Sequence, residues 1–382
     1  MEWTLVILRL VDARQLSADG ELHDLLVRAG ARLVPSEGAR WRRRGDGWEN
    51  QDDLADRNAK LVDRIRRLPG ADRTLADALA ECCADASEDD RARLLGYVQG
   101  FHAADPTSLS ARWLGEVEAK QPAEDSDLRS LDGTAPILRA LATAPVNEAT
   151  RLGTVVVGLH WRRGRVEVQT RKDGPVVGDA AVVTVPLPIL RALPITPELP
   201  ELTSAAALLR MGHVVKLVAR FDVPFWTDIV PGGPMLFLQV PGKPIPVWWT
   251  APAGAPVLTG WAGGPAAERL AGTAELDLLR LAVESLAAGL GLREQDVRPR
   301  LREHHWHDWS SDQFARGAYS YVGVGGTRAH EVLSRPVEDT LFFAGEATCG
   351  EGLNATMEGA LQSGRRAAAR LLSSRASGDP SA

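Results

Sequence analysis

The chain has 382 residues, of which 45% are hydrophobic, and this length suffices for two lobes that each bury a core of their own. A net charge of -6 argues against a nucleic-acid-binding surface, and no apolar run approaches the length of a membrane span. The three cysteines form neither a disulfide framework nor a metal-ligand spacing, which favours a reducing, cytoplasmic setting.

The first half of the chain divides into a helical part and a strand-rich part. Residues 1–19 match no recognisable pattern, and residues 20–124 are predicted to be mostly helical, because apolar residues recur three and four positions apart. A basic stretch within them, RWRRRGDGWE, predicts a hairpin with its arginines at an exposed tip. In residues 125–198 a loop and a helix precede three β-branched runs that predict strands, TVVVGLHW, RVEVQT and AVVTVPL.

The second half of the chain also contains both helical and strand-rich stretches. Residues 199–330 predict a helix, four strands and two more helices, followed by a strand-loop-strand segment with glycine turns. Residues 331–373 predict a strand and a long helix, and the polar residues 374–382 predict a disordered tail. Helical and strand blocks that alternate along one chain predict a two-lobed α/β (α+β mixed) fold, with each lobe assembled from separated segments.

The most informative stretch is the last predicted strand and helix, residues 341–372. An apolar run of strand length leads into a Gly-Glu loop, after which Asn354 is predicted to cap the helix. Gly359 and Gly364 weaken a helix interior unless close packing requires them. The amino end of a helix offers free N–H groups and a partial positive charge, so this one can face an anion; a plain βα unit closing a sheet is the alternative.

Lys216 is the most informative single residue. Alternation along HVVKLVARF puts Lys216 on one face with Val214 and Val218, and the other apolar residues on the opposite face. A lysine in this setting either lies on an edge strand, where it discourages aggregation, or is desolvated inside the protein. Periodicity alone favours the edge strand, because unpaired lysine is seldom buried.

Several of these segments together resemble the flavin-containing amine oxidases, the family of polyamine oxidases, monoamine oxidases and flavin-dependent histone demethylases. The resemblance rests on FAGEAT followed by NATMEGALQSGRRAA, on GHVVKLVARFDVPFW, and on a W…GAYS pattern, and it runs from about Gly20 to Leu372. It implies a FAD-binding Rossmann-like lobe, made from residues 125–198 and 331–373. It also implies a substrate lobe, made from residues 20–124 and 199–330.

The resemblance also implies catalytic residues. Lys216 matches the lysine that holds a water beside the flavin N5 atom, and Trp309 matches a tryptophan that lies against the flavin. Tyr319 matches one wall of the substrate cage, and Thr356 stands opposite it, as in the polyamine-oxidase and demethylase branch. The covalently flavinylated members carry a cysteine directly before the cage tyrosine; Ala318 stands here, which implies FAD bound non-covalently.

A second set of positions is implied to bind the cofactor. Glu346 matches a glutamate that accepts hydrogen bonds from FAD hydroxyls, and Gly345 lets the backbone approach the pyrophosphate. Val156 matches a strand residue whose backbone contacts adenine. The remaining implied contacts with the flavin are Trp309 and the backbone of Ala355, Thr356 and Met357.

The strand-GxGxxG-helix unit with which family members begin is missing from this sequence. Three explanations are open: a start assigned too late, a separate chain that supplies the missing segment, or a decayed and inactive remnant. The first is favoured. The FAD-binding lobe is therefore expected to be incomplete.

The resemblance implies an enzyme that transfers a hydride from the carbon beside an amine nitrogen to flavin N5, releases an imine for hydrolysis, and returns electrons to oxygen. The alternatives are a non-catalytic remnant or interaction module, and a flavin desaturase or porphyrinogen-type oxidase. The expected partners are a small amine and oxygen, without nucleic acid or membrane. No metal site is expected, because His304, His305 and His307 lack partners at ligand spacing.

Overall fold

The computed structural model describes residues 20–119, 128–350 and 352–376, and the chain divides into two compact units. The first unit consists of the described parts of Met1–Arg32, Asp132–Met211 and Tyr319–Ala382; the second consists of those of Leu33–Leu131 and Gly212–Ala318. Each unit is thus assembled from separated segments, as predicted. The limits differ from the predicted ones, because residues 20–32, 199–211 and 319–330 group with the first unit, and residues 128–131 group with the second. The segment at residues 1–19 lies outside the described residues.

A seven-stranded mixed sheet forms the centre of the second unit, with the strand order β15-β11-β14-β13-β12-β2-β3. Neighbouring strands are antiparallel except β12 and β2, which run parallel. In sheet order the strands are β15 (Leu301–Trp306), β11 (Val214–Phe221), β14 (Val257–Gly263), β13 (Val247–Thr250), β12 (Met235–Gln239), β2 (Ala39–Arg44) and β3 (Gly47–Asn50). A separate two-stranded sheet pairs β1 (Leu33–Pro35) with β4 (Leu128–Ser130).

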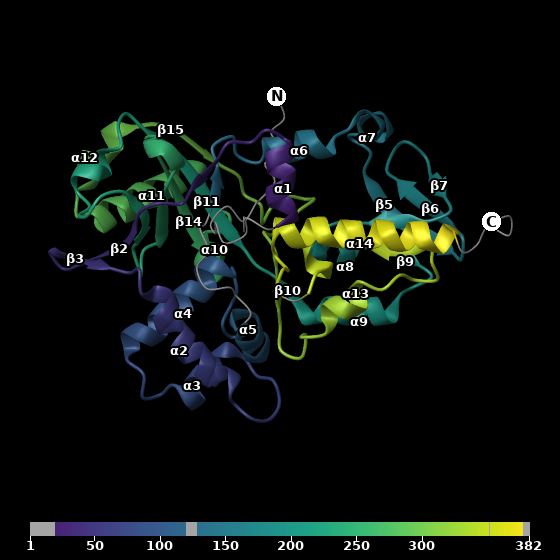
Figure 1. Ribbon diagram of the computed structural model, residues 1–382, viewed down its shortest axis with the longest axis horizontal. Coiled ribbons are helices and arrows are strands. Elements are labelled where there is room, and N and C mark those ends of the chain that lie inside the picture. Colours follow the sequence, from purple (N-terminus) through teal and green to yellow (C-terminus); the bar gives the residue numbers. More distant parts are fainter. Residues whose placement is uncertain (1–19, 120–127, 351, 377–382) are drawn as a thin grey trace. The chain divides into compact units, whose positions relative to one another are not determined.

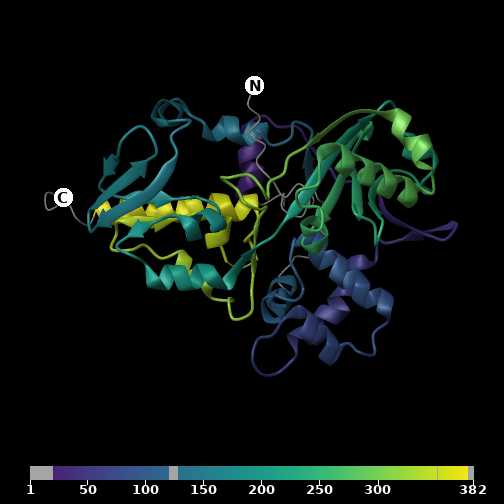
Figure 2. The same cartoon turned by 180° about the vertical axis from the view of Figure 1, so that it is seen from behind.

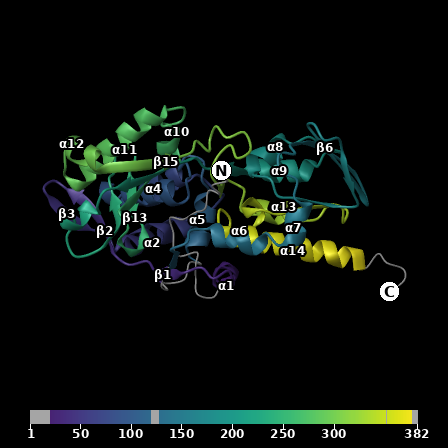
Figure 3. The ribbon, with the colours of Figure 1, turned by 90° about the horizontal axis from the view of Figure 1, so that it is seen from above.

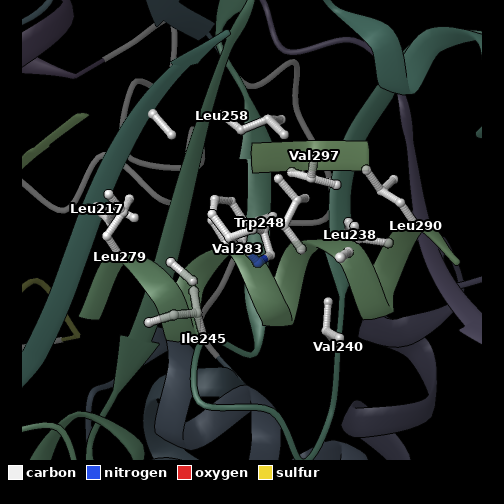
Figure 4. Packing of buried hydrophobic residues seen from close by; sticks show 14 of the residues in the cluster. Leu217, Leu238, Val240, Ile245, Trp248, Leu258, Leu279, Val283, Leu290 and Val297 are labelled. Carbon is white, nitrogen blue, oxygen red and sulfur yellow. The ribbon is translucent and has the colours of Figure 1, made fainter. Parts of the chain in front are cut away.

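Helix α11 (Glu275–Leu290) packs against this sheet and completes the main hydrophobic core. Leu279 and Val283 of the helix pack in one cluster with strand residues such as Trp248 (Figure 4). Gly291 ends the helix in the left-handed conformation, at φ 70, which a β-carbon would disfavour. Two short helices, α10 (Pro265–Glu268) and α12 (Glu294–Val297), lie beside it (Figure 3).

A group of four helices completes the second unit and gathers at one end of the sheet (Figures 1 and 2). These are α2 (Leu54–Arg66), α3 (Leu75–Cys82), α4 (Glu88–Phe101) and α5 (Ala111–Glu118). The hydroxyl groups of Thr74, Ser87 and Ser110 cap the last three, each accepting a hydrogen bond from the amide three residues later. These three helices therefore begin where a side-chain acceptor satisfies one of their first amides, whereas α2 has no side-chain cap.

The predicted basic hairpin is β2 and β3, but its arginines are not confined to an exposed tip. Arg42 lies within β2, and its guanidinium group is 3.0 Å from the carboxylate of Asp89 on α4. Arg93, whose side chain is 3% exposed, binds Asp89 and Asp90 from the same helix. The Arg42–Asp89 ion pair fastens the hairpin to α4, and the Arg93 pairs hold the acidic side chains within the helix. The strand sequence gives no sign of partners 47 residues away.

The first unit contains three small sheets. A four-stranded sheet has the order β7-β6-β5-β9, β17 pairs in parallel with β8, and β10 pairs antiparallel with β16. The strands are β5 (Val156–Arg162), β6 (Arg165–Thr170), β7 (Val176–Gly178), β8 (Ala181–Val183), β9 (Ile195–Thr196), β10 (Leu209–Met211), β16 (Ser320–Val322) and β17 (Leu341–Phe343). The shorter helices are α1 (Glu21–Arg28), α6 (Ala135–Leu141), α7 (Ala144–Ala149), α8 (Leu187–Ala192), α9 (Pro200–Leu208) and α13 (Ala329–Leu333).

Helix α14 (Met357–Ala376) runs along the first unit and is drawn in yellow in Figure 1. Its Ala367 packs against Phe342 of β17, as the predicted strand-helix pairing requires. The helix continues to Ala376, so residues 374–376 of the predicted tail are helical; the others lie outside the described residues. No helix in the described ranges is both long enough and apolar enough to cross a lipid bilayer.

Helix α1 is fastened to the amino end of α14 by a buried carboxylate. Glu358, which is 8% exposed, accepts hydrogen bonds from the amides of Leu22 at 2.9 Å and Glu21 at 3.3 Å. Gln362, one turn further along α14, donates to the same carboxylate at 2.8 Å. The first-turn amides of α1 are thereby satisfied by a side chain from the opposite end of the chain, which accounts for residues 20–32 grouping with the first unit.

Candidate functional site

Hydrogen bonds hold the loop after β17 in one conformation. The amide of Gly345 donates to Ser363 on α14 at 2.8 Å. Gly345 has φ 115, and a β-carbon there would meet only the Thr184 carbonyl oxygen, at 3.8 Å. The glycine is therefore required by the backbone conformation, and the space beside it is not filled by protein. A backbone with open space next to it suits close approach by a ligand.

The turn that follows, at Glu346–Thr348, is fixed by two side chains that the sequence did not single out. Nδ1 of His330 donates to the carbonyl oxygen of Ala347 at 2.9 Å, and Arg366 donates to the hydroxyl of Thr348 at 2.9 Å. Since Nδ1 carries the proton, Nε2 of this buried ring is an acceptor, and it has no partner among the described residues. Burial lowers the pKa of His330 below its usual range, so the ring is neutral.

The carboxylate of Glu346 joins two segments that are far apart in the sequence. One oxygen accepts from the amide of Ser320 at 3.0 Å. The other accepts from the hydroxyl of Ser320 at 2.7 Å and from the amide of Ala355 at 2.7 Å. Tyr319, which is 3% exposed, directly precedes Ser320, and Thr356 directly follows Ala355. The structure therefore brings together three predicted site residues of the first unit around one carboxylate.

Helix α14 begins later than the sequence indicated. It starts at Met357 and is capped by Thr356, whose hydroxyl accepts from the amide of Gly359 at 2.8 Å and donates to the Leu353 carbonyl at 2.6 Å. The predicted cap at Asn354 is wrong, because this residue lies outside the helix. Its Nδ2 donates instead to the carbonyl oxygen of Ser320 at 3.4 Å.

The amino end of α14 has the features of a site that receives an electronegative group. Ala355 adopts the left-handed conformation, with φ 65, which costs a non-glycine residue about 1–2 kcal/mol. The Oδ1 atom of Asn354, a residue 2% exposed, has no hydrogen-bond partner in the described part of the chain. Strain directly before a 20-residue helix fits a bound group with an electronegative atom at the positive end of the helix dipole. The orphaned Oδ1 is an acceptor, so the same group would have to offer it an N–H or O–H donor. The backbone at Ala355, Thr356 and Met357 would hold this group.

Val156 begins β5 and is 40% exposed. It pairs with Thr170 of β6, and the register shifts between Val156 and Gly158. The adenine contact stays a prediction.

Lys216 lies in the interior of the seven-stranded sheet of the second unit. Alternation along β11 is confirmed, since Val215, Leu217, Ala219 and Phe221 face the main core and Lys216 faces the other way. The edge-strand alternative is wrong, because β11 lies between β15 and β14. Sequence periodicity cannot distinguish an edge strand from a central one, because strand order depends on tertiary pairing.

The ammonium group of Lys216 is desolvated. It lies on the strand position paired with Trp261 of β14, and burial lowers its pKa from 10.5 to about 8. No acidic side chain forms an ion pair with it among the residues that the structure describes. Lys216 is partly buried, and a desolvated cation without a carboxylate is costly and is retained chiefly where chemistry uses it.

Trp309 lies in the loop after β15, in the same unit as Lys216. Its carbonyl accepts from the amide of Gly317 at 3.0 Å. The next residue, Ser310, forms a 2.9 Å hydrogen bond with Nδ1 of His213, directly before β11. The backbone beside Trp309 is therefore tied to the beginning of the strand that carries Lys216. Of the nearby histidines, His307 stacks edge-on against Trp309 with ring centroids 4.3 Å apart.

Comparison with known proteins identifies the family. The sequence model of the flavin containing amine oxidoreductases matches residues 13–372. The chain belongs to this family. Polyamine oxidase 3 of Oryza sativa subsp. japonica is 33% identical over 254 residues, which cover 62% of this chain and 47% of that protein.

A histone demethylase is similar over a shorter range. Lysine-specific histone demethylase 1 homolog 3 of Arabidopsis thaliana is 34% identical over 215 residues, which cover 54% of this chain and 13% of that protein. The chain thus spans about half, or less, of the length of these curated relatives.

Solved structures of the family share the fold. Wild-type putrescine oxidase bound to putrescine superposes with a TM-score of 0.75 at 18% identity, covering 92% of this chain and 85% of that one. Cyclohexylamine oxidase from Brevibacterium oxydans IH-35A gives 0.73 at 19% identity, covering 94% and 86%. The predicted mixed α/β (α+β) flavin amine oxidase fold is confirmed.

Membership of the family implies a flavin cofactor. The predicted site residues are divided between the two units. The loop of Gly345 and Glu346 and the start of α14 lie in the first unit, with Tyr319 and Val156. Lys216 and Trp309 lie in the second. Sequence reasoning missed Ser320, His330 and Arg366, because each acts through a partner distant in sequence. The only local signal is the position of Ser320 next to a predicted cage residue.

Proposed function

We propose that this protein oxidises an amine with FAD held non-covalently, and that oxygen accepts the electrons. When bound, the flavin supplies the acceptor for a hydride from the carbon next to the amine nitrogen. Water then hydrolyses the resulting imine, while oxygen is reduced to hydrogen peroxide. Support comes from family membership and from the absence of a cysteine before Tyr319, where Ala318 stands.

The observation that carries this proposal is the desolvated Lys216, a partly buried lysine with no ion-pair partner among the described residues. With a pKa of about 8, its side chain can lose and regain a proton near neutral pH. Its neighbours are apolar and aromatic, so a water molecule is the natural hydrogen-bond partner for the ammonium group. A lysine that orients such a water and relays a proton suits both imine hydrolysis and the reduction of oxygen.

Tyr319 and Thr356, both of the first unit, are proposed to line the substrate cage, and Trp309 keeps the flavin contact that the resemblance implies. Aromatic faces attract an amine by cation–π interaction and shield its carbon chain from water. The hydroxyl of Thr356 is committed to capping α14, so this residue would turn its methyl group toward a substrate. A cage with one aromatic wall and one small wall fits a flexible aliphatic di- or polyamine better than a flat aromatic amine.

The cofactor would be held by the first unit. Glu346 and Gly345 are proposed to meet the ribityl and pyrophosphate parts, and Val156 the adenine. The amides at Thr356 and Met357 are proposed to face flavin N1 and O2, where negative charge develops on reduction. The amide of Ala355 donates to Glu346, so Ala355 would contact the flavin through the rest of its backbone. The three cysteines are free, which supports the predicted reducing, cytoplasmic location.

Anaerobic titration tests this function. The purified protein is saturated with FAD, and putrescine, spermine and benzylamine are added in turn while the flavin absorbance is recorded. The proposal predicts that an aliphatic amine bleaches the absorbance and that air restores it with release of hydrogen peroxide. Bound FAD that no amine reduces would contradict the proposal and favour a desaturase or a non-catalytic protein.

A further inference from the structure

The two walls proposed for the cage, Tyr319 and Thr356, are connected through one carboxylate. Ser320 begins β16, is 1% exposed, and pairs with Met211 of β10. Its position is therefore fixed by the sheet, and it follows Tyr319 directly. The carboxylate of Glu346, 26 residues later, is bound by both its amide and its hydroxyl.

The same carboxylate holds the other wall. The amide of Ala355 donates to it at 2.7 Å, and Thr356 is the next residue. Because Ala355 is left-handed, its amide needs a strong acceptor to offset the backbone strain, and a carboxylate provides one. Asn354 adds a second link between the segments, through its 3.4 Å hydrogen bond to the carbonyl oxygen of Ser320.

We propose that Ser320 and Glu346 are positioning residues that fix the spacing of Tyr319 and Thr356, and with it the width of the amine cage. This inference rests on the proposed function for the roles of the two walls. Three hydrogen bonds to one charged acceptor allow little independent movement, because a displaced carboxylate would leave three donors on buried residues unsatisfied. Glu346 therefore acts within the protein, in addition to the cofactor contact proposed above.

The hydroxyl of Ser320 is the part of this arrangement that can be removed without changing charge or backbone. Ser320→Ala deletes one of the three bonds, and Ser320→Thr restores a hydroxyl. Ser285→Ala is a matched control in the other unit. Ser285 is 0% exposed, and its hydroxyl also makes two hydrogen bonds, to the Leu281 carbonyl at 2.8 Å and from the Ile245 amide at 3.2 Å.

Hydrogen–deuterium exchange of the protein without FAD gives a readout that does not depend on activity. In Ser320→Ala, the amides of residues 353–357 should exchange about tenfold faster, as expected when a hydrogen bond to a charged group is lost nearby. Ser320→Thr should stay within about twofold of the wild type, and Ser285→Ala should leave this segment unchanged. Faster exchange confined to residues 319–322 would overturn the proposal.

Steady-state kinetics of the FAD-loaded protein provides the second readout. A wider cage should raise KM for the amine about tenfold in Ser320→Ala and leave kcat within about threefold, with recovery in Ser320→Thr. An unchanged KM alongside faster exchange would overturn the role in the cage. If Ser320→Ala does not fold, Ser320→Cys takes its place. A wild type without amine oxidation would contradict the proposed function, and the exchange data would still decide whether the carboxylate joins the two segments.

Discussion

Replacing glycine by alanine is expected to change the stability in opposite directions at two positions of helix α14. A β-carbon at Gly364 would meet nothing within 4 Å, whereas one at Gly359 would collide with the carbonyl oxygen of Leu353. It would also lie 2.9 Å from the carbonyl carbon of Leu353 and 3.2 Å from the β-carbon of Cys349. Gly364→Ala should therefore stabilise the protein by about 0.5–1 kcal/mol through helix propensity alone. Gly359→Ala should destabilise it by about 1–3 kcal/mol, because backbone atoms must move to make room.

Urea unfolding followed by circular dichroism measures both effects, and FAD titration measures their consequence for the site. The amide of Gly359 donates to the capping hydroxyl of Thr356, so a shift there disturbs the amino end of α14. Gly359→Ala should bind FAD about tenfold more weakly, a loss of about 1.4 kcal/mol, and Gly364→Ala should bind it as the wild type does. Equal stability and equal FAD affinity in the two variants would refute the close packing of this turn.

Two further predictions concern pH. The pKa of His330 is lowered by burial, so the unfolded chain binds the proton more readily; stability should be complete above about pH 6.5 and fall as the pH drops below it. His330→Gln should lower the stability at neutral pH but remove its decrease in acid. If urea unfolding shows the same decrease in acid for this variant, the assignment of that decrease to His330 is wrong. The pKa of Lys216 is lowered from 10.5 to about 8, so between these values the unfolded chain binds more protons and stability should rise with pH. Lys216→Met should abolish a rise on the order of a few kcal/mol, and a rise that persists in this variant would assign it to another group.

Much of the fold could be predicted from the sequence because its signals are local. Alternation along residues 214–221 gave a strand and the face of Lys216, and the apolar run at 341–343 gave β17. The two glycines of α14 were recognised as needing a packing reason. Only the structure shows that Gly359 has one and Gly364 does not, because the group that decides it is a carbonyl in the preceding loop.

The contacts that organise the site could not be predicted, because they join distant segments. Glu346 follows a strand in a way that suits a solvated loop acid, and nothing near it in the sequence points to Ser320 or Ala355. The helix cap was assigned to Asn354 because asparagine is a good cap. The backbone at Ala355 turns into the left-handed region first, and the helix begins after Thr356. Tertiary hydrogen bonds overrode local preference at this point.

The most direct test of the account compares amine oxidation by Lys216→Met with that by Lys243→Met. Lys243 is a partly exposed lysine of the same unit, paired with Glu284 at 3.1 Å, so its loss removes a positive charge away from the apolar setting of Lys216. The account predicts that Lys216→Met lowers the rate on the order of a hundredfold or more while FAD stays bound, and that Lys243→Met stays within about twofold of the wild type. Equal rates in the two variants would contradict a catalytic role for Lys216.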